Sequence, residues 1–272
     1  IHNAAFEAAG LNYVYVAFHV EDVTGCMAGM RALPSFRGMS VTIPHKVAVM
    51  AHLDEIDPMA RHVGCVNTVT HEDGRLIGSI TDGLGTLRAF EEAGVSLKGR
   101  SVLFVGSGGA VRAVAFAIAE MAAPSRVTIL GRTPSRVEAV VADLRRHSPV
   151  PIESGDLTAD LEKALVGHDV IIHGTPVGMQ GHREGESLVA PHLLRPDCVV
   201  FDMVYRPLHT RLIVDAQAAG CTTILGTEML LNQAVLQFEQ WTGDPAPRDA
   251  MRQALDAALR EDGTGTDRAA KG

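Results

Sequence analysis

From Ser101 to Gly226, short apolar runs alternate with amphipathic stretches. The apolar runs are SVLFVG at 101–106, RVTILG at 126–131, DVIIHG at 169–174, CVVFDMVY at 198–205 and TTILG at 222–226. A strand with one solvent-exposed face alternates apolar and polar residues, and these runs do not. They must therefore be covered on both faces, as in a parallel sheet. The intervening stretches 109–121, 135–147 and 209–220 are amphipathic, as expected of helices. The pattern predicts an α/β fold with a doubly wound, Rossmann-type domain.

The flanking segments are less regular and predict a second α/β domain. Ahead of the repeat we expect helices at 2–10, 23–33 and 45–53, strands at 12–20 and 36–44, and a hairpin at 65–81 with its turn at Asp73-Gly74. Two helical stretches, 227–241 and 248–260, follow the last strand, and we expect them to return to the first domain. We therefore predict a substrate-binding domain from 1–82 and 227–262 and a nucleotide-binding domain from 83–226. Residues 263–272 have nothing to bury and are predicted to form a mobile tail.

Charge and composition narrow the function classes. The formal net charge of the 272 residues is -8 and no Lys/Arg-rich run occurs, which excludes the electrostatic footprint of a nucleic-acid or anionic-membrane binder. A small-molecule partner is expected instead. No apolar run reaches the roughly eighteen residues of a membrane span and no signal-peptide pattern is present, so we expect a cytoplasmic protein. Because neither helices nor aromatic residues mark a partner face, both monomer and homodimer remain open.

The cysteines and histidines do not suggest a metal centre. The four cysteines are widely spaced, and the twelve histidines show no metal-ligand spacing. We expect reduced, mostly buried thiols and no metal. The cysteines are Cys26, Cys65, Cys198 and Cys221.

The first strand of the repeat ends in a glycine-rich turn that leads into an apolar helix. Glycines allow a pyrophosphate to approach the backbone, and the helix N-terminus offers unpaired N–H groups to it. The third glycine of the GxGxxG pattern is replaced by Val111, so an ordinary tight turn is the alternative. The turn consists of Gly106, Ser107, Gly108, Gly109 and Ala110.

The end of the next strand indicates which dinucleotide would bind. A site for NAD usually has an acidic residue there, which binds the ribose 2′-OH. Here the strand ends in Gly131-Arg132-Thr133, with Arg136 one helical turn beyond. Two guanidinium groups and a hydroxyl match a 2′-phosphate. Solvated arginines are the alternative, but cations at a helix N-terminus oppose the helix dipole, so a bound anion explains them better. We predict NADP as the cofactor.

Two residues suggest acid–base chemistry. Lys46 follows a strand and a proline and begins the expected helix 45–53, where a cation opposes the dipole and releases its proton more readily. Asp82 lies where the hairpin ends and the helix predicted at 83–94 begins. A surface lysine and a helix N-cap are the alternatives. Facing one cleft, the two groups would pass a proton to a ketone or from an alcohol, while NADPH supplies a hydride. These residues predict a carbonyl reductase or alcohol dehydrogenase.

Several sequence blocks, in one order, resemble the shikimate dehydrogenase family from the first residue to about Trp241. The blocks are Ile1-His2-Asn3, SVTIPHK at 40–46, GCVNT at 64–68, TDG at 81–83, GSGGAVRA at 106–113, GRTPSR at 131–136, DMVYRPLHT at 202–210 and GTEMLLNQ at 226–233. The resemblance implies the reversible NADP-linked reduction of 3-dehydroshikimate to shikimate, a step toward aromatic amino acids.

The resemblance also implies roles for individual residues. Lys46 and Asp82 correspond to the catalytic pair, with Lys46 as the acid/base at the reacting oxygen. The substrate's hydrogen-bonding partners would be Thr42, Asn67, Asp82, Tyr205 and Gln233. On the cofactor side, residues Gly106 to Ala110 would bind the pyrophosphate, and the adenosine end would contact Gly131, Arg132, Thr133 and Arg136. Met203 and Gly226 would border the nicotinamide.

The chain departs from the family pattern at three places. It starts at Ile1, and the family's Ser-x-Ser pair and first strand are expected upstream of it. Ser40 stands where the family usually has Asn, and Ile80 replaces the Asn common before the TDG block. The last two changes leave room for a relative of shikimate such as quinate. A quinate/shikimate dehydrogenase of broader range and a non-catalytic NADP-binding sensor are therefore the alternatives.

Overall fold

The computed structural model describes residues 1–264 and divides the chain into two compact units. One unit contains Ile1–Thr81 and the chain from Leu231 onward, and the other is Asp82–Leu230. The last helix, α10, runs from Arg248 to Thr264, so residues 263 and 264, predicted as tail, are helical. The rest of the predicted tail, 265–272, lies outside the described residues. Among residues 1–264, no helix is both long and apolar enough to cross a membrane.

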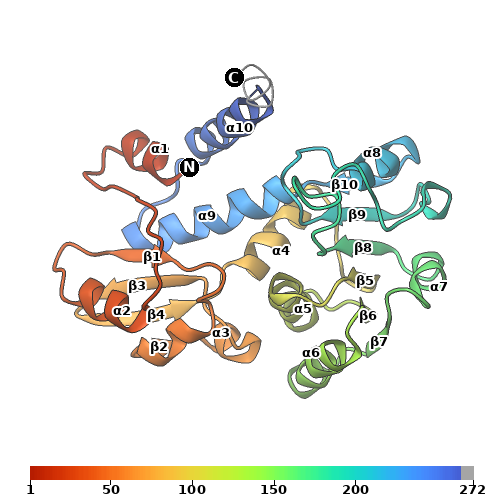
Figure 1. Cartoon of the computed structure of the whole chain (residues 1–272), viewed down its shortest axis with the longest axis horizontal. Helices are drawn as coiled ribbons and strands as arrows, with labels where there is room; N and C mark the ends of the chain where they lie inside the picture. Colours follow the sequence, from red (N-terminus) through yellow and green to blue (C-terminus); the bar gives the residue numbers. More distant parts are fainter. Residues whose placement is uncertain (265–272) are drawn as a thin grey trace. The chain divides into compact units, whose positions relative to one another are not determined.

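The second unit is built on a six-stranded parallel sheet in the order β10-β9-β8-β5-β6-β7. Helices α5 and α6 cover one face, and α7 and α8 cover the other (Figure 1). This confirms the predicted doubly wound fold. The strands are β5 (Ser101–Val105), β6 (Arg126–Gly131), β7 (Ile152–Asp156), β8 (Val170–His173), β9 (Val199–Asp202) and β10 (Thr222–Ile224). The helices are α4 (Asp82–Glu92), α5 (Gly109–Met121), α6 (Pro134–His147), α7 (Leu161–Val166), η2 (Pro191–Leu193) and α8 (Arg211–Ala218).

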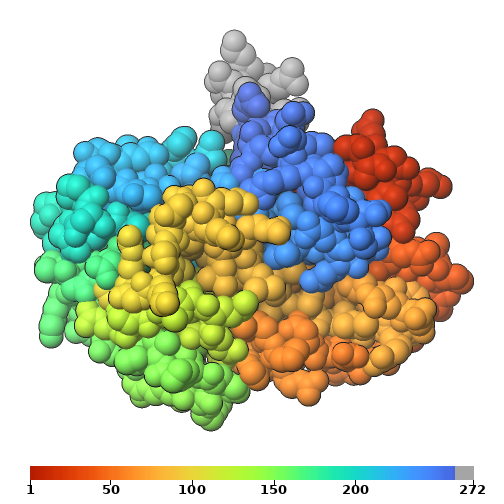
Figure 2. All heavy atoms as spheres, turned by 180° about the vertical axis from the view of Figure 1, so that it is seen from behind, coloured from red at the N-terminus to blue at the C-terminus, as the bar shows by residue number. Residues whose placement is uncertain are grey.

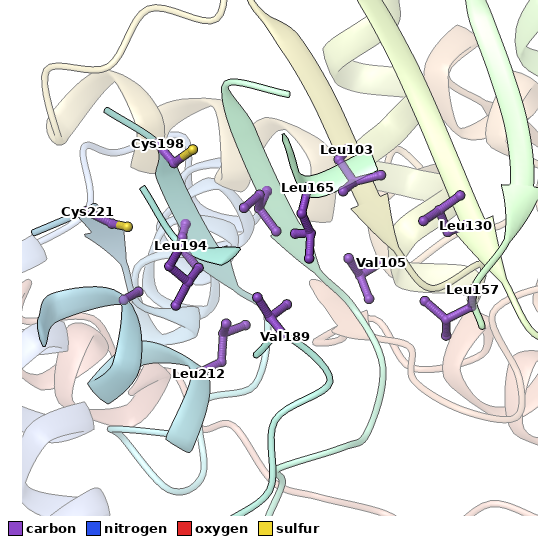
Figure 3. Packing of buried hydrophobic residues seen from close by; sticks show 13 residues of the cluster. Leu103, Val105, Leu130, Leu157, Leu165, Val189, Leu194, Cys198, Leu212 and Cys221 are labelled. Carbon is purple, nitrogen blue, oxygen red and sulfur yellow. The ribbon is translucent and has the colours of Figure 1, made fainter. Parts of the chain in front are cut away.

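The central strands are buried on both faces, which explains their unbroken apolar sequence. Leu103 and Val105 of β5 and Val200 of β9 belong to one core cluster, which also includes residues of α7 and α8 (Figure 3). Phe201 is also fully buried and meets Phe90 of α4 edge to face, with ring centroids 5.8 Å apart. The successive residues Val200 and Phe201 of β9 thus pack on opposite faces of the sheet.

Three elements of this unit, β7, α7 and the 3-10 helix η2, have no counterpart in the sequence prediction. In the described part of the chain, strand β7 pairs with β6 alone, and only the first of its five residues, Ile152, is buried. An edge strand needs little apolar surface, so the hydrophobic pattern does not reveal it. Helix α7 has only six residues, of which Leu165 alone is buried.

The first unit contains a four-stranded sheet in the order β1-β3-β4-β2. Its strands are β1 (Gly38–Ser40), β2 (Glu55–Ile56), β3 (Thr68–Glu72) and β4 (Arg75–Ser79). Strands β3 and β4 form the predicted hairpin. Asp73 and Gly74 both have positive φ, 48° and 78°, as a two-residue type I′ turn requires. The predicted strand 36–44 is confirmed with narrower bounds, as β1.

Helices from both ends of the chain complete this unit. Helix α1 (His2–Ala8) lies beside α10, as Figure 1 and Figure 2 show. The remaining elements are α2 (Val23–Arg31), η1 (Ala48–His52), α3 (Pro58–Val63) and α9 (Gly226–Thr242). From Leu231 onward, α9 belongs to this unit. The Trp241 indole N–H donates to the carbonyl of Val69, 3.0 Å away, and ties the end of α9 to β3.

The strand predicted at 12–20 is wrong. The segment is irregular, and among the described residues it pairs with no strand of the sheet. Its apolar side chains are largely in solvent, with Val14 76% and Phe18 67% exposed. The backbone of Tyr15 bonds instead to the side chain of Asn3, at 2.7 Å and 2.9 Å. Apolar alternation without a neighbouring strand does not make a ladder.

The α-helix predicted at 45–53 is also wrong. The segment forms only the five-residue 3-10 helix η1, which begins at Ala48. The carbonyl of Lys46 accepts the N–H of Val66 at 2.8 Å, so it is used by a neighbouring segment rather than by the next helical turn. Lys46 therefore lies ahead of a short 3-10 helix, and the dipole argument made for it has no basis in the structure.

Candidate functional site

The glycine-rich turn of the second unit connects β5 to α5. Gly106 is buried with φ of 123°, and a Cβ there would lie 2.9 Å from the carbonyl oxygen of Gly174. At Gly108 and Gly109 nothing lies within 4 Å of where a Cβ would be, and both residues are exposed, as is Ala110. The turn thus leaves open space above the first N–H groups of a thirteen-residue helix, which is the arrangement that accepts a phosphate.

A glycine that follows β8 compensates for the missing third glycine of the motif. Val111 is fully buried. A Cβ added to Gly174, the residue after β8, would lie 2.3 Å from Val111 Cγ2 and 2.9 Å from the sulfur of Met203. The close approach that the motif requires is therefore made by a valine on α5 packing against a glycine after β8. The departure at Val111 does not disrupt the turn.

The end of β6 presents an unpartnered cationic group. Arg132, Thr133 and Arg136 are all exposed at the start of α6, and among residues 1–260, whose side chains the structure describes, neither guanidinium takes part in a hydrogen bond or ion pair. A Cβ on Gly131 would lie 2.7 Å from Ser107 Oγ, so the glycine-rich turn and the end of β6 are in contact. Two cations at a positive helix end, next to the open glycine-rich turn, suit an anionic ligand.

A small pocket adjoins Arg132 within the second unit. Its volume is about 140 Å³, enough for a single ring rather than a whole ligand. It is lined by Arg132, Leu157, Thr175, Pro176, Val177, His182, Arg183 and Leu188. Most of these residues belong to the loop that follows β8, and no sequence motif had indicated that loop.

The two residues expected beside the nicotinamide are in contact with each other. A Cβ on Gly226, the first residue of α9, would lie 2.8 Å from the carbonyl oxygen of Met203 and 2.6 Å from that of Val204. Only glycine allows this approach. Met203 follows β9, and its N–H donates to the carbonyl of His173 at 2.9 Å. Tyr205, predicted to contact substrate, is 41% exposed on the same loop.

A buried polar network at the ends of β8 and β9 was missed by sequence reasoning. His173 Nδ1 donates to Asp202 Oδ1 at 2.9 Å, and Thr210 Oγ1 donates to Asp202 Oδ2 at 2.6 Å. His173 Nε2 contacts the hydroxyl of Thr175, which accepts the N–H of Val177. His173, Asp202 and Thr210 are each at most 2% exposed. The network holds the loops after β8 and β9. A His and an Asp that each end an apolar strand were the available signal.

In the first unit, Asn67 is the centre of a second buried network. Its Nδ2 donates to Thr81 Oγ1 at 3.0 Å and to Gln233 Oε1 at 3.3 Å. Its Oδ1 accepts the Thr81 N–H at 2.9 Å and the Thr68 hydroxyl at 2.7 Å. The structure thus brings together two of the predicted substrate-binding residues, Asn67 and Gln233. It also ties Asn67 to Thr81, the residue before Asp82.

The hydroxyl of Ser40 extends this network. It donates to Gln237 Oε1 at 3.0 Å, and Gln237 Nε2 donates to Thr68 Oγ1 at 2.9 Å. The serine that replaces the family's usual asparagine therefore has a partner on α9. Thr42, two residues later, is exposed and lines a cavity of about 550 Å³ within this unit, to which Ser40 and His45 also contribute.

The two proposed catalytic residues belong to different units. Lys46 is half-buried in the first unit, where its carbonyl bonds to the residue before Asn67. Asp82 is 4% exposed and is the first residue of α4 in the second unit, and its carbonyl accepts the Thr86 hydroxyl at 3.0 Å. The pairing of the two side chains stays a prediction.

Comparison with known proteins places this chain. Residues 1–69 match the family model described as the shikimate dehydrogenase substrate binding domain, and residues 226–255 match that of the shikimate 5′-dehydrogenase C-terminal domain. The chain is 44% identical over 263 residues to the shikimate dehydrogenase (NADP(+)) of Symbiobacterium thermophilum, a match that covers 95% of this chain and 89% of that protein. The chain belongs to the shikimate dehydrogenase family.

Solved structures of the family share the fold. Shikimate 5-dehydrogenase from Listeria monocytogenes, in complex with shikimate and NAD, is 35% identical with a TM-score of 0.87, over 93% of this chain and 90% of that one. Quinate dehydrogenase from Corynebacterium glutamicum, in complex with NAD, is 30% identical with a TM-score of 0.87, over 94% and 92% of the two chains. The family assignment made from the sequence blocks is confirmed.

Proposed function

We propose that this protein is an NADP-dependent shikimate dehydrogenase that reversibly reduces 3-dehydroshikimate to shikimate. The observation that carries the proposal is the likeness to NADP(+)-dependent shikimate dehydrogenases over nearly the whole chain. The cofactor side agrees with it, because the end of β6 presents Arg132 and Arg136 without a protein partner in the described chain. We assign residues 1–82 and 227–262 to the substrate-binding domain and residues 83–226 to the NADP-binding domain, so Asp82 and residues 227–230 count with the substrate-binding domain although they lie in the second compact unit.

On the cofactor side, the N–H groups of the turn Gly106–Ala110 hold the pyrophosphate in the open space above α5. Arg132 and Arg136 donate charge-assisted hydrogen bonds to the 2′-phosphate, with the Thr133 hydroxyl as a further donor. Met203 and Gly226 border the nicotinamide ring. NADPH supplies the hydride of the reduction.

On the substrate side, the hydroxyl and carboxylate groups need several polar partners, because each buried polar group left unpaired costs about 1–3 kcal/mol. These partners are Thr42, Asn67, Asp82, Tyr205 and Gln233. The hydrogen bonds of Asn67 to Thr81 and Gln233 hold its amide in one orientation before any ligand binds. A rigid amide loses little entropy on binding.

We assign the proton transfer to the Lys46 ammonium, with Asp82 as the carboxylate that the family resemblance pairs with it. In the reduction, Lys46 gives a proton to the oxygen that becomes the alcohol, and in the oxidation it takes that proton back. The Asp82 carboxylate stabilises the ammonium and orients it toward the reacting oxygen. We expect the enzyme to work in the cytoplasm as a monomer or homodimer.

Nicotinamide absorbance tests the proposal directly. Shikimate and quinate are each offered with NADP and with NAD, and we expect the highest kcat/KM for shikimate with NADP. Comparable turnover of quinate would instead indicate the broader quinate/shikimate enzyme, a possibility raised by the fold shared with a quinate dehydrogenase. Cofactor binding without any shikimate-dependent reduction would leave the NADP-binding sensor.

A further inference from the structure

The pocket beside Arg132 has a second arginine in its wall. Arg183, from the loop after β8, lines the same space of about 140 Å³ as Arg132. The two arginines therefore border one small space. The loop is held in place, because the Gly178 N–H donates to the carbonyl of His182 at 3.1 Å, and the His182 N–H to that of Met179 at 2.8 Å. Arg183 therefore belongs to a formed loop.

The charge of Arg183 is partly offset by an acid outside the pocket wall. Arg183 Nε donates to Glu186 Oε2 at 2.9 Å, and a second N–H of the guanidinium reaches the same oxygen. This hydrogen bond holds the pKa of the Glu186 carboxyl below its ordinary value, so Glu186 is ionised at neutral pH. Arg132 has no such counterion among the described residues. The two arginines thus differ in how much positive charge they offer.

We propose that Arg183 is a further cation for the 2′-phosphate of NADP, in addition to Arg132 and Arg136, and that Glu186 limits the strength of this contact. The inference rests on the proposed function as far as NADP binding is concerned. A phosphate accepts hydrogen bonds from a guanidinium fork readily, whereas NAD has only a hydroxyl at that position and gains little from an additional arginine. The Arg183–Glu186 pair therefore tunes the preference for NADP over NAD. Glu186 competes with the phosphate for the same N–H groups.

The two halves of the pair give opposite predictions for binding. Dissociation constants of NADP and NAD are measured by titration calorimetry on the full chain, without substrate. Arg183→Gln should raise the Kd of NADP about fivefold, the scale of one exposed charge contact, and change that of NAD less than twofold. Glu186→Gln should lower the Kd of NADP about threefold for the same reason. Arg183→Lys should retain part of the NADP affinity, and both shifts should shrink at high salt.

The ion pair of Arg75 with Glu55 provides a matched control. Its side chains are 56% and 52% exposed, the same as those of Arg183 and Glu186, but they belong to the first unit. Arg75→Gln and Glu55→Gln should leave both dissociation constants unchanged. Equal shifts for NADP and NAD, or a Glu186→Gln variant that binds NADP no better than the parent, would overturn the inference.

The experiment separates this inference from the proposed function. A protein that binds NADP with these opposite shifts but does not oxidise shikimate would refute the enzyme and keep the role of Arg183. A protein that oxidises shikimate with NADP, while Arg183→Gln leaves NADP binding unchanged, would refute the role of Arg183 alone.

Discussion

The packing of Val111 against Gly174 can be tested by enlarging the side chain at 174 and shortening the one at 111, separately and together. In Gly174→Ala, the new methyl would lie 2.3 Å from Val111 Cγ2 and 2.9 Å from the sulfur of Met203. The thioether of Met203 can turn away, because methionine is flexible. Val111 is fully buried on α5 and, being β-branched, has one preferred rotamer there. The clash with Val111 therefore decides the cost, about 1–3 kcal/mol of the free energy of unfolding.

The reverse change makes room. Val111→Ala removes two buried methyl groups and should cost about 2 kcal/mol by itself. If the two effects were independent, the double variant would lose roughly 4 kcal/mol. Because the methyl on residue 174 would occupy the space that Val111 leaves, we expect a loss of only about 1–2 kcal/mol. The favourable coupling should thus be about 2 kcal/mol.

Urea unfolding followed by circular dichroism, without cofactor, measures this coupling from the parent and three variants. The KM for NADPH gives a second measurement, since Gly174→Ala displaces Met203 beside the proposed nicotinamide site and Val111→Ala should restore it. Losses that add within about 0.5 kcal/mol would refute the packing argument. They would mean that the glycine at 174 is not compensating for the valine of the motif.

Three further predictions concern catalysis, cofactor choice and acid stability. Lys46→Ala should lower kcat by about a hundredfold or more and change KM for shikimate little, in steady-state assays, because it removes the acid/base. Arg132→Ala should raise KM for NADP far more than that for NAD, because only NADP has the 2′-phosphate. Burial lowers the pKa of His168, so just below pH 6.5 the unfolded chain binds a proton that the folded protein does not. Stability in urea should therefore fall as pH decreases below about 6.5, and fall less in His168→Gln.

Each of these has a contrary result. A Lys46→Ala enzyme that keeps most of its turnover would exclude the acid/base role. Equal changes in the two cofactor constants would mean that Arg132 does not contact the phosphate. If the parent and His168→Gln lose stability in parallel between pH 7.5 and 5, the histidine makes no contribution to acid sensitivity.

Several features of this protein follow from short stretches of sequence. The apolar runs of β5, β8 and β9 predicted a parallel sheet because a strand covered on both faces has no polar positions. Asp73-Gly74 predicted the hairpin turn because only a few residues adopt left-handed backbone conformations readily. The glycine-rich turn was identifiable because its backbone conformation and its helix are both local.

Other features were decided only by contacts between distant segments. The segment 12–20 has a strand-like pattern but finds no pairing partner among the described residues, whereas β7 lacks the pattern and pairs with β6. The role of Gly174 depends on Val111, and that of Arg183 on the pocket it shares with Arg132. His173 and Asp202 meet because neighbouring parallel strands end at one edge. Hydrogen-bond pairing and close packing join residues far apart in the chain, so periodicity within one segment does not determine them.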